Sequence, residues 1–351
     1  MEPVRIGSKL IGSGFPTFIV AEAGVNHKGS LEAAKRMIDE ARRAGADAVK
    51  FQTYKAEKLV TKTAPAFWDD IQSTATQYAV YKRSGQFGEA EYRALFTHAE
   101  NVGITCLSTP FDLEAVRMLD GLGVPAFKVA SADLTNYPLL RAVAKTGKPV
   151  ILSTGASTLV EVQASVDFLH RHGCSDIVLL YAVLSYPTPI ETVNLRRIQT
   201  LQAEFPDMPV GFSDHSLPDP CMVVPSLAVA LGAALVEKHF TLDRGLPGDD
   251  HYLSAEPEQF AVMVRNIRAI ETALGDPSFG YQAAEEEARR FARRSIVSAV
   301  FIPMGTRITM DMLIMKRPGT GISPAELPQL VGRTATVDIQ PDTVLNWDMV
   351  D

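Results

Sequence analysis

Eight short apolar segments alternate with longer, helix-like stretches along most of the chain, and this alternation limits the possible fold most strongly. The segments are residues 17–21, 46–51, 104–107, 126–130, 149–152, 177–181, 209–212 and 234–238. Apolar runs of this length predict buried strands, whereas residues 31–44 and 159–172 repeat apolar side chains at helical spacing, with Ser30 and Ser157 as predicted caps. Strand and helix alternating eight times predict an α/β protein built as a (β/α)₈ (TIM) barrel.

Each predicted strand ends in side chains that can ionise or form hydrogen bonds. In such barrels the carboxyl ends of the strands form the face that carries the active site. Lys50 and Glu237 interrupt otherwise apolar strands, which a simple transition from strand to loop does not explain. Alternation with a period of two places Lys50 beside Gln52, and Glu237 beside His239. We therefore expect one site at this face, formed by Glu22, Lys50, Gln52, Thr109, Lys128, Ser131, Ser153, Tyr186, Ser213, His215, Glu237 and His239.

Two histidines in this set suggest a metal. His215 and His239 end successive predicted strands, and a barrel would bring their imidazoles together. With Glu237 or Asp250 nearby, two imidazoles suit a divalent transition metal that keeps open coordination positions. For either histidine taken alone, the alternative is a structural role in a loop.

Two lysines and several hydroxyls suggest an anion. Lysines supply point charges and hydroxyls supply directed donors, a combination that suits a phosphate or carboxylate group. Two lysines at one barrel mouth would repel each other unless an anion or an acidic side chain lies between them. The candidates are Lys50, Lys128, Thr109, Ser131, Ser153 and Ser213, and the alternative is a set of barrel-lining residues bonded to one another.

The chain of 351 residues is longer than a typical barrel of about 250 residues. We predict a barrel domain over residues 1–275, a charged helical linker over 276–294 and a small β-rich domain over 295–351. Strands are predicted at 298–301 and 334–337 in that last segment. A unit of this size has little core of its own, so we expect it to lean on a partner surface.

Composition and motifs exclude several classes of protein. A formal charge of −7 argues against nucleic acid as a partner. No run of about eighteen apolar residues occurs and the first residues lack a signal-peptide core, so we expect a cytoplasmic protein with no membrane partner. Cys106, Cys174 and Cys221 are too few and too widely spaced for a disulfide framework or a zinc site. Neither a nucleotide-binding glycine motif nor a serine hydrolase motif is present.

Motifs along nearly the whole chain resemble those of the N-acetylneuraminate (sialic acid) synthases. In order, they are IVAEAGVNHKGSLEAAKRMIDEARRAGADAVKFQTYKAEKLVT, LSTPFD, FKVASADLTNYPLL, PVILSTGAS, YPTP, GFSDHS and VEKHFTLDRGLPGDDH. KRPGTGISP resembles the signature of the C-terminal antifreeze-like (SAF) domain of that family. The resemblance implies a barrel followed by a β-clip domain that caps the partner's active site in a domain-swapped homodimer.

The resemblance also implies a reaction, in which phosphoenolpyruvate condenses with the open-chain aldehyde of an N-acylated hexosamine such as N-acetylmannosamine. The products would be a sialic-acid-type nonulosonic acid and phosphate. The resemblance implies that Mn²⁺ or Mg²⁺ binds His215 and His239. It also implies that Glu22, Glu237 and Lys50 lie at the reacting centre. The base that activates water is left open between Glu22, Glu237 and a hydroxide on the metal. Phosphoenolpyruvate would contact Lys50, Thr109, Lys128, Ser131, Ser153 and Ser213, and the sugar Gln52, Tyr186, Asp250 and, from the other subunit, Arg317.

Two departures from the family pattern concern the acceptor sugar. Leu184 stands where sialic acid synthases usually carry Asn, and RPGTG replaces the commoner RPGNG. An apolar residue in a polar site indicates a differently decorated sugar, so the precursors of legionaminic, pseudaminic or Kdn-type acids remain alternatives. A 3-deoxy-heptulosonate-type synthase acting on a phosphorylated sugar is a further alternative, although we find no additional basic cluster for a second phosphate. The last alternative is a binding protein, in which the barrel has no activity and carries a binding domain.

Overall fold

The computed structural model describes residues 2–66, 76–84, 87–248 and 250–351. By contacts between its residues the chain divides into two compact units, Met1–Gly275 and Asp276–Asp351. Each unit has an apolar core of its own. The predicted linker, residues 276–294, therefore falls with the second unit.

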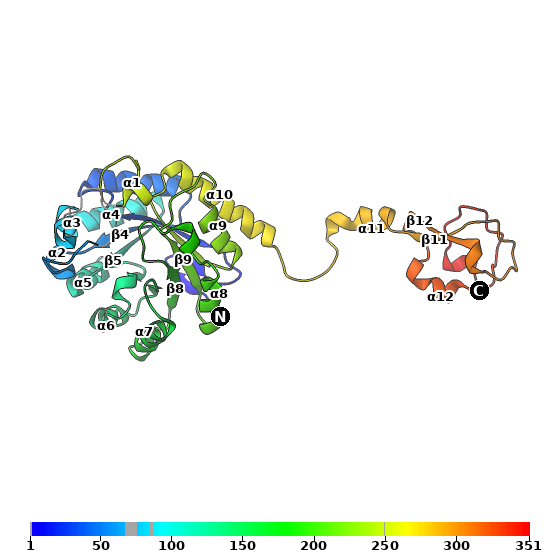
Figure 1. Cartoon of the computed structure of the whole chain (residues 1–351), viewed down its shortest axis with the longest axis horizontal. Helices are drawn as coiled ribbons and strands as arrows, with labels where there is room; N and C mark the ends of the chain where they lie inside the picture. The colour runs from blue at the N-terminus through cyan, green and yellow to red at the C-terminus, as the bar shows by residue number, and fades with distance from the viewer. Residues whose placement is uncertain (1, 67–75, 85–86, 249) are drawn as a thin grey trace. The chain divides into compact units, whose positions relative to one another are not determined.

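The first unit is a barrel of eight parallel strands ringed by helices (Figure 1). The strands run in the order β5-β4-β3-β10-β9-β8-β7-β6, and β5 and β6 at the ends of this order are also in contact. The eight predicted strands and the (β/α)₈ architecture are confirmed, with strand ends shifted by at most three residues. The strands are β3 (Phe18–Gly24), β4 (Ala48–Thr53), β5 (Thr105–Pro110), β6 (Phe127–Val129), β7 (Val150–Ser153), β8 (Ile177–Ala182), β9 (Val210–Asp214) and β10 (Leu235–His239).

In the described part of the chain, eight helices surround these strands. Ser30 caps α1 as predicted, since its side chain accepts a hydrogen bond from Ala33 N–H. The predicted cap at Ser157 is wrong by one residue, because Thr158 forms a capping box with Glu161 while the Ser157 hydroxyl donates to Gly155 O. The helices are α1 (Leu31–Arg43), α4 (Glu89–Val102), α5 (Leu113–Gly121), α6 (Tyr137–Ala144), α7 (Leu159–Arg171), α8 (Arg197–Glu204), α9 (Val223–Ala230) and α10 (Pro257–Leu274), with 3₁₀ turns η1 (Ser131–Asp133), η2 (Ile190–Thr192) and η3 (His251–Leu253).

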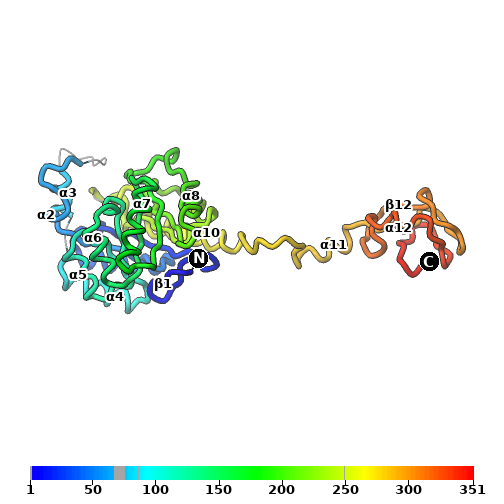
Figure 2. The backbone as a smooth tube through the Cα atoms, turned by 90° about the horizontal axis from the view of Figure 1, so that it is seen from below, coloured from blue at the N-terminus to red at the C-terminus, as the bar shows by residue number. Residues whose placement is uncertain are grey.

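Two additions lie at opposite ends of the barrel (Figure 2). A hairpin of β1 (Val4–Ile6) and β2 (Lys9–Ile11), absent from our prediction, lies against the amino ends of β5 and β9 through Gly7 and Gly12. At the other end are α2 (Ala56–Leu59) and α3 (Gln77–Arg83), which follow β4 and precede α4 along the chain. The hairpin therefore covers part of the amino end of the barrel, opposite the end at which the strands terminate.

Within the described residues, no helix combines the length and the apolarity needed to cross a bilayer. The cytoplasmic location stays a prediction.

The second unit contains α11 (Glu286–Ala292), α12 (Leu327–Leu330) and one antiparallel pair, β11 (Ser295–Ser298) with β12 (Leu313–Lys316). The strand predicted at 298–301 is wrong, because the ladder with β12 ends at Ser298 and Phe301 is exposed. The strand predicted at 334–337 is also wrong, since only isolated bridges form at Thr334 and Ala335. Four 3₁₀ turns complete the unit: η4 (Ala283–Glu285), η5 (Met310–Met312), η6 (Pro324–Glu326) and η7 (Trp347–Met349).

The RPGTG segment rests against α11 within this unit. Gly319 N–H donates to Arg290 O at 2.9 Å. A Cβ at Gly319 would lie 2.7 Å from Arg293 Cβ, so only glycine allows this approach. Arg317, two residues earlier, is exposed.

Candidate active site

A cavity of about 700 Å³ lies at the carboxyl ends of the barrel strands. Its lining comes from β3 to β10 and from the loops that follow them. Leu184, the departure from the family pattern, is part of it. Arg317 belongs to the second unit and is not among the lining residues. All other predicted site residues line the cavity: Glu22, Lys50, Gln52, Thr109, Lys128, Ser131, Ser153, Tyr186, Ser213, His215, Glu237, His239 and Asp250.

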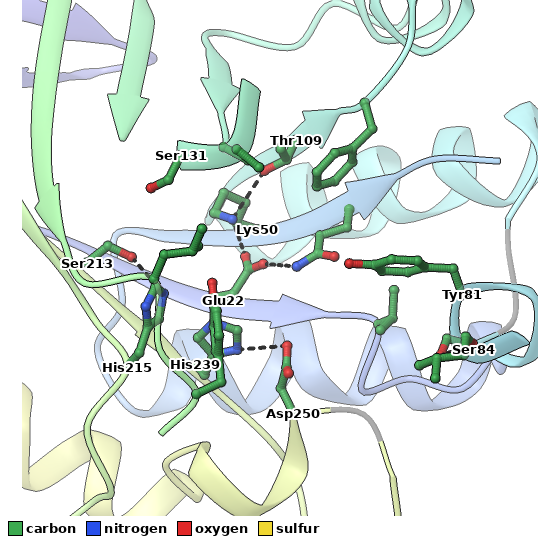
Figure 3. Close-up of a pocket in the computed structure, with 18 of the residues that line it drawn as sticks. Glu22, Lys50, Tyr81, Ser84, Thr109, Ser131, Ser213, His215, His239 and Asp250 are labelled. Carbon is green, nitrogen blue, oxygen red and sulfur yellow. Dashed lines mark hydrogen bonds and ion pairs between the residues drawn. The ribbon is translucent and has the colours of Figure 1, made fainter. Parts of the chain in front are cut away.

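Lys50 forms the centre of a buried charge cluster (Figure 3). Its Nζ lies 2.5 Å from Glu22 Oε2 and 3.6 Å from Glu237 Oε2. It also donates to Thr109 Oγ1 at 3.3 Å. The amide of Gln52, on the same side of β4, donates to Glu22 Oε1 at 2.9 Å. Acidic side chains thus relieve the repulsion that we expected between the two lysines of the barrel mouth.

The two carboxylates of this cluster differ in their proton affinity. Burial raises the pKa of Glu22, and this effect outweighs the opposing charge of Lys50. Burial also disfavours ionised Glu237, but Lys128, Lys50 and a hydrogen bond from Ser213 hold the pKa of Glu237 well below its ordinary value. Two carboxyl groups whose pKa values are pushed apart can take opposite roles in proton transfer. Glu237 is therefore the more readily ionised of the two carboxyl groups, and Glu22 is the more easily protonated one.

Lys128 lies on β6 among hydroxyl groups. Its Nζ donates to Ser153 Oγ at 2.7 Å and to Val129 O at 3.2 Å. Ser131 Oγ accepts from Gly155 N–H at 2.9 Å, and a Cβ at position 155 would lie 2.8 Å from that oxygen. Burial lowers the pKa of Lys128 to about 8. No carboxylate is within ion-pair distance of Lys128 in the described part of the chain, so its charge is available for an anion.

The two predicted metal ligands lie side by side. The ring centroids of His215 and His239 are 5.3 Å apart. His215 Nδ1 is 2.7 Å from Val183 O and donates to it, which leaves Nε2 as the lone-pair nitrogen. Burial and the neighbouring His239 lower the pKa of His215 to about 4, so its ring is neutral at pH 7. A neutral imidazole oriented by a backbone carbonyl is the form that binds a metal.

A complete protein cage for a metal is not formed. In the ranges that the structure describes, no three His, Cys, Asp or Glu side chains are arranged to hold an ion. Two imidazoles with open positions nevertheless fit a divalent ion that also binds substrate oxygens. His239 Nδ1 lies 3.3 Å from Asp250 Oδ2, and the charge of His239 lowers the pKa of Asp250 despite its burial. The two imidazoles therefore fit a divalent transition-metal ion such as Mn²⁺ better than Mg²⁺, which prefers oxygen ligands.

The loop after β10 is tied to the loop after β3. Asn26 accepts from Asp250 N–H at 3.2 Å, and its amide donates to Phe240 O at 2.9 Å. His251 Nδ1 lies 2.7 Å from Thr241 Oγ1, which fixes the same loop from within. Asp249 of the GLPGDDH motif lies outside the described residues. These contacts hold Asp250 at the cavity.

Sequence reasoning missed one wall of the cavity. Tyr81 of α3 and the adjacent Ser84 line it, and the Tyr81 ring points toward Glu22 (Figure 3). Burial raises the pKa of Tyr81 to about 12, so it stays a neutral hydroxyl. Arg244 was also missed. The available signal was the long connection between β4 and α4, because long loops at this end of a barrel commonly carry function.

Comparison with known proteins places this geometry in a family. Residues 37–278 match the NeuB family, and residues 293–351 match the SAF domain. The chain belongs to the NeuB family. It is 40% identical to the N,N'-diacetyllegionaminic acid synthase of Legionella pneumophila over 352 residues, 98% of each chain. It is 38% identical to human N-acetylneuraminate-9-phosphate synthase over 346 residues, 97% of this chain and 94% of the human protein.

A solved structure agrees. The crystal structure of N-acetylneuraminic acid (sialic acid) synthetase from Leptospira borgpetersenii matches with a TM-score of 0.73 at 38% identity. The match covers 82% of this chain and 95% of that chain. The resemblance to sialic acid synthases is therefore confirmed, and this NeuB-family protein is an enzyme of the nonulosonic acid synthase class. The reading as a binding protein without activity is set aside. The roles of individual side chains stay predictions.

Proposed function

We propose that this NeuB-family enzyme condenses phosphoenolpyruvate with an unphosphorylated, open-chain N-acylated hexosamine. One observation carries the proposal: a single cavity contains a buried Lys50 paired with two carboxylates, a second lysine among hydroxyls, and two adjacent imidazoles. The products are a nonulosonic acid and phosphate.

Phosphoenolpyruvate is the substrate that the lysines suit. Among the described residues, Lys128 has hydroxyl neighbours and no carboxylate within ion-pair distance, which favours it as the contact for the phosphate or carboxylate of phosphoenolpyruvate. Lys50 is already paired with the carboxylates of Glu22 and Glu237. Its ammonium group is therefore fixed in position beside the proposed phosphoenolpyruvate site. The hydroxyls of Thr109, Ser131, Ser153 and Ser213 are the remaining proposed donors to this substrate.

The reaction forms one carbon–carbon bond and one carbon–oxygen bond to water, and it breaks the carbon–oxygen bond to phosphate. C3 of phosphoenolpyruvate attacks the aldehyde carbon, water adds to C2, and phosphate leaves by cleavage of the C2–O bond. Held by His215 and His239, Mn²⁺ or Mg²⁺ would supply Lewis acidity toward the aldehyde oxygen. Glu237, the anion of the pair, takes the proton from water. Glu22 and Lys50, 2.5 Å apart, share a proton that can pass through Glu22 to the oxygen of the former aldehyde, because burial raises the pKa of Glu22.

The acceptor is proposed from the outer lining of the cavity. Apart from Lys50 and Lys128, Arg244 is the one cationic side chain among the described lining residues. A second phosphate calls for a cluster of cations, so a phosphorylated hexose or heptulosonate-type substrate is disfavoured. The apolar side chains suit N-acyl or methyl substituents, which favours the precursors of sialic, legionaminic and pseudaminic acids over the plain hexose that a Kdn-type acid requires. These side chains are Leu59, Val60, Val80, Phe111 and Leu184.

Phosphate release with phosphoenolpyruvate and a panel of acceptors tests this function. The panel contains those hexose precursors, a plain hexose and a 6-phosphorylated N-acetylhexosamine, each with Mn²⁺ or Mg²⁺. We expect metal-dependent release with an unphosphorylated N-acylated hexosamine. Preference for the phosphorylated sugar would contradict the proposed acceptor, and no release with any sugar would contradict the proposed reaction.

Replacing Lys128 should weaken phosphoenolpyruvate binding while the fold survives. We expect Lys128→Ala to raise KM for phosphoenolpyruvate by about 30-fold or more, since truncating one partner of a buried charge pair costs about 2–4 kcal/mol. Steady-state kinetics at saturating sugar measure the change. Near-normal saturation by phosphoenolpyruvate would refute the assignment.

The same lysine predicts a pH dependence. With a pKa of about 8 in the free enzyme, Lys128 is charged below that pH and loses its proton above it. A bound anion favours the charged form, so Kd for phosphoenolpyruvate should be flat between pH 7 and 8 and rise by at most about tenfold per pH unit above this range. Lys128→Arg is the matched control, because arginine keeps its charge and should abolish the rise.

We also propose the domain-swapped homodimer, in which Arg317 reaches the acceptor in the partner's site. The exposure of Arg317 and the support of its segment by α11 are consistent with a residue presented to another surface. Arg317→Ala should raise KM for the sugar about tenfold and leave KM for phosphoenolpyruvate unchanged. Lys316→Ala is the control, since Lys316 pairs with Asp342 within its own unit.

Mixing two variants tests the swap directly. Lys128→Ala and Arg317→Ala dimers are dissociated together and reassembled. If the cap acts across subunits, hybrid dimers contain one intact site, and about a quarter of all sites regain normal kinetics. If each cap serves its own barrel, every site keeps one defect and no site recovers, which would refute the swap.

A further inference from the structure

The ends of β9 and β10 carry a buried ion pair on the side of the sheet that faces away from the cavity. Alternate residues point inward, among them Ser213 and Glu237, which line the cavity. Asp214 and Lys238 lie between these inward positions and are cross-strand partners in the β9–β10 register. Lys238 Nζ lies 2.9 Å from Asp214 Oδ2, and both side chains are at most 1% exposed.

The fold does not require charges at these positions. Two residues earlier on each strand, and on the same face of the sheet, Val236 pairs with Phe212. Both are buried apolar side chains. Burying two charges carries a desolvation penalty, and well-packed apolar residues often stabilise such positions as well or better. The best-attested use of a buried polar or ionic group is to fix one arrangement among several. A positioning role therefore explains the pair better than stability does.

The pair holds the backbone that follows His215. Asp214 Oδ1 accepts from Ser216 N–H at 2.9 Å, and Lys238 Nζ donates to Ser216 O. Both backbone groups of Ser216 are thereby bonded to the pair, while Thr188 N–H donates to His215 O at 2.9 Å. Lys238 itself directly precedes His239. One ion pair thus links the two strand ends that carry the two imidazoles.

We infer that Asp214 and Lys238 are positioning residues that set the separation of His215 and His239 for a divalent cation. This inference rests on the metal site of the proposed function. His215 directly follows β9 and His239 ends β10, so their spacing depends on how the two strand ends are held together. Substituting a residue that orients a metal ligand without binding the metal typically lowers metal affinity by about 10- to 100-fold.

A double substitution tests the inference, because a single one would leave an unpaired buried charge and endanger the fold. Asp214→Asn with Lys238→Met removes both charges and keeps the side-chain volumes close to the original. We expect a native circular dichroism spectrum and cooperative thermal unfolding, but a Kd for Mn²⁺ about tenfold or more weaker, measured by electron paramagnetic resonance of the free ion. Phosphoenolpyruvate affinity without metal should stay unchanged.

The matched control is Asp47→Asn with Arg268→Met, which neutralises a partly buried ion pair of 3.1 Å at the amino end of the barrel. It should leave Mn²⁺ affinity unchanged. Equal Mn²⁺ affinity in wild type and in the Asp214/Lys238 variant would overturn the positioning role but not the proposed metal site. A wild-type protein that binds no Mn²⁺ would overturn the metal site as well, and an equal loss in both double variants would show a general effect of stability and overturn the positioning role.

Discussion

Glu237→Gln should lower kcat by about 10³-fold, the range expected when a general base is lost. Glutamine keeps the shape of the side chain and an oxygen that can accept from Ser213, which donates to Glu237 at 2.9 Å. Lys50 keeps Glu22 as its partner at 2.5 Å, so the cluster retains one ion pair. The loss therefore falls on proton transfer from water more than on the architecture of the site.

The two kinetic parameters should respond differently. Removing a negative charge near Lys50 and Lys128 favours an anionic substrate, so KM for phosphoenolpyruvate should stay the same or fall. Steady-state phosphate release measures both parameters. Glu114→Gln is the control, because this exposed carboxylate pairs with Lys55 and Lys58 and is not among the residues that line the cavity. A kcat within tenfold of wild type would exclude Glu237 as the base and direct attention to Glu22.

His215→Ala should weaken Mn²⁺ binding by at least about 100-fold, because even partners that act through a ligand are worth 10- to 100-fold. Phosphate release should fall by a similar or larger factor at limiting metal. Wild-type activity should be lost on treatment with a chelator and return when Mn²⁺ or Mg²⁺ is added. Calorimetric titration of metal-free protein gives the affinity without reliance on turnover.

His170→Ala provides the matched histidine control, since His170 is exposed on α7. It should bind Mn²⁺ as wild type does. If His215→Ala also binds Mn²⁺ normally, the imidazoles of the cavity are not the ligands. The hydrogen bond from His215 to Val183 O would then serve the loop alone.

The barrel could be predicted because its evidence is local. A short apolar run is enough to predict a buried strand. The two-residue periodicity of a strand places Lys50 and Gln52 on the same side, independently of the rest of the chain. The small unit was predicted poorly because its three- and four-residue pieces pair over long distances, as the bridge of Arg307 to Thr334 shows. The β1–β2 hairpin was missed because strands of three residues show no periodicity.

The sequence by itself determined the eightfold alternation, the polar face of the barrel and the identity of the groups that could act there. Only the tertiary structure decided that Lys50 lies between Glu22 and Glu237, that Tyr81 forms a wall, and that Asp214 pairs with Lys238. Each of these depends on distances between segments far apart along the chain. The pKa differences follow from the same packing, because burial and neighbouring charges exist only once the barrel has closed.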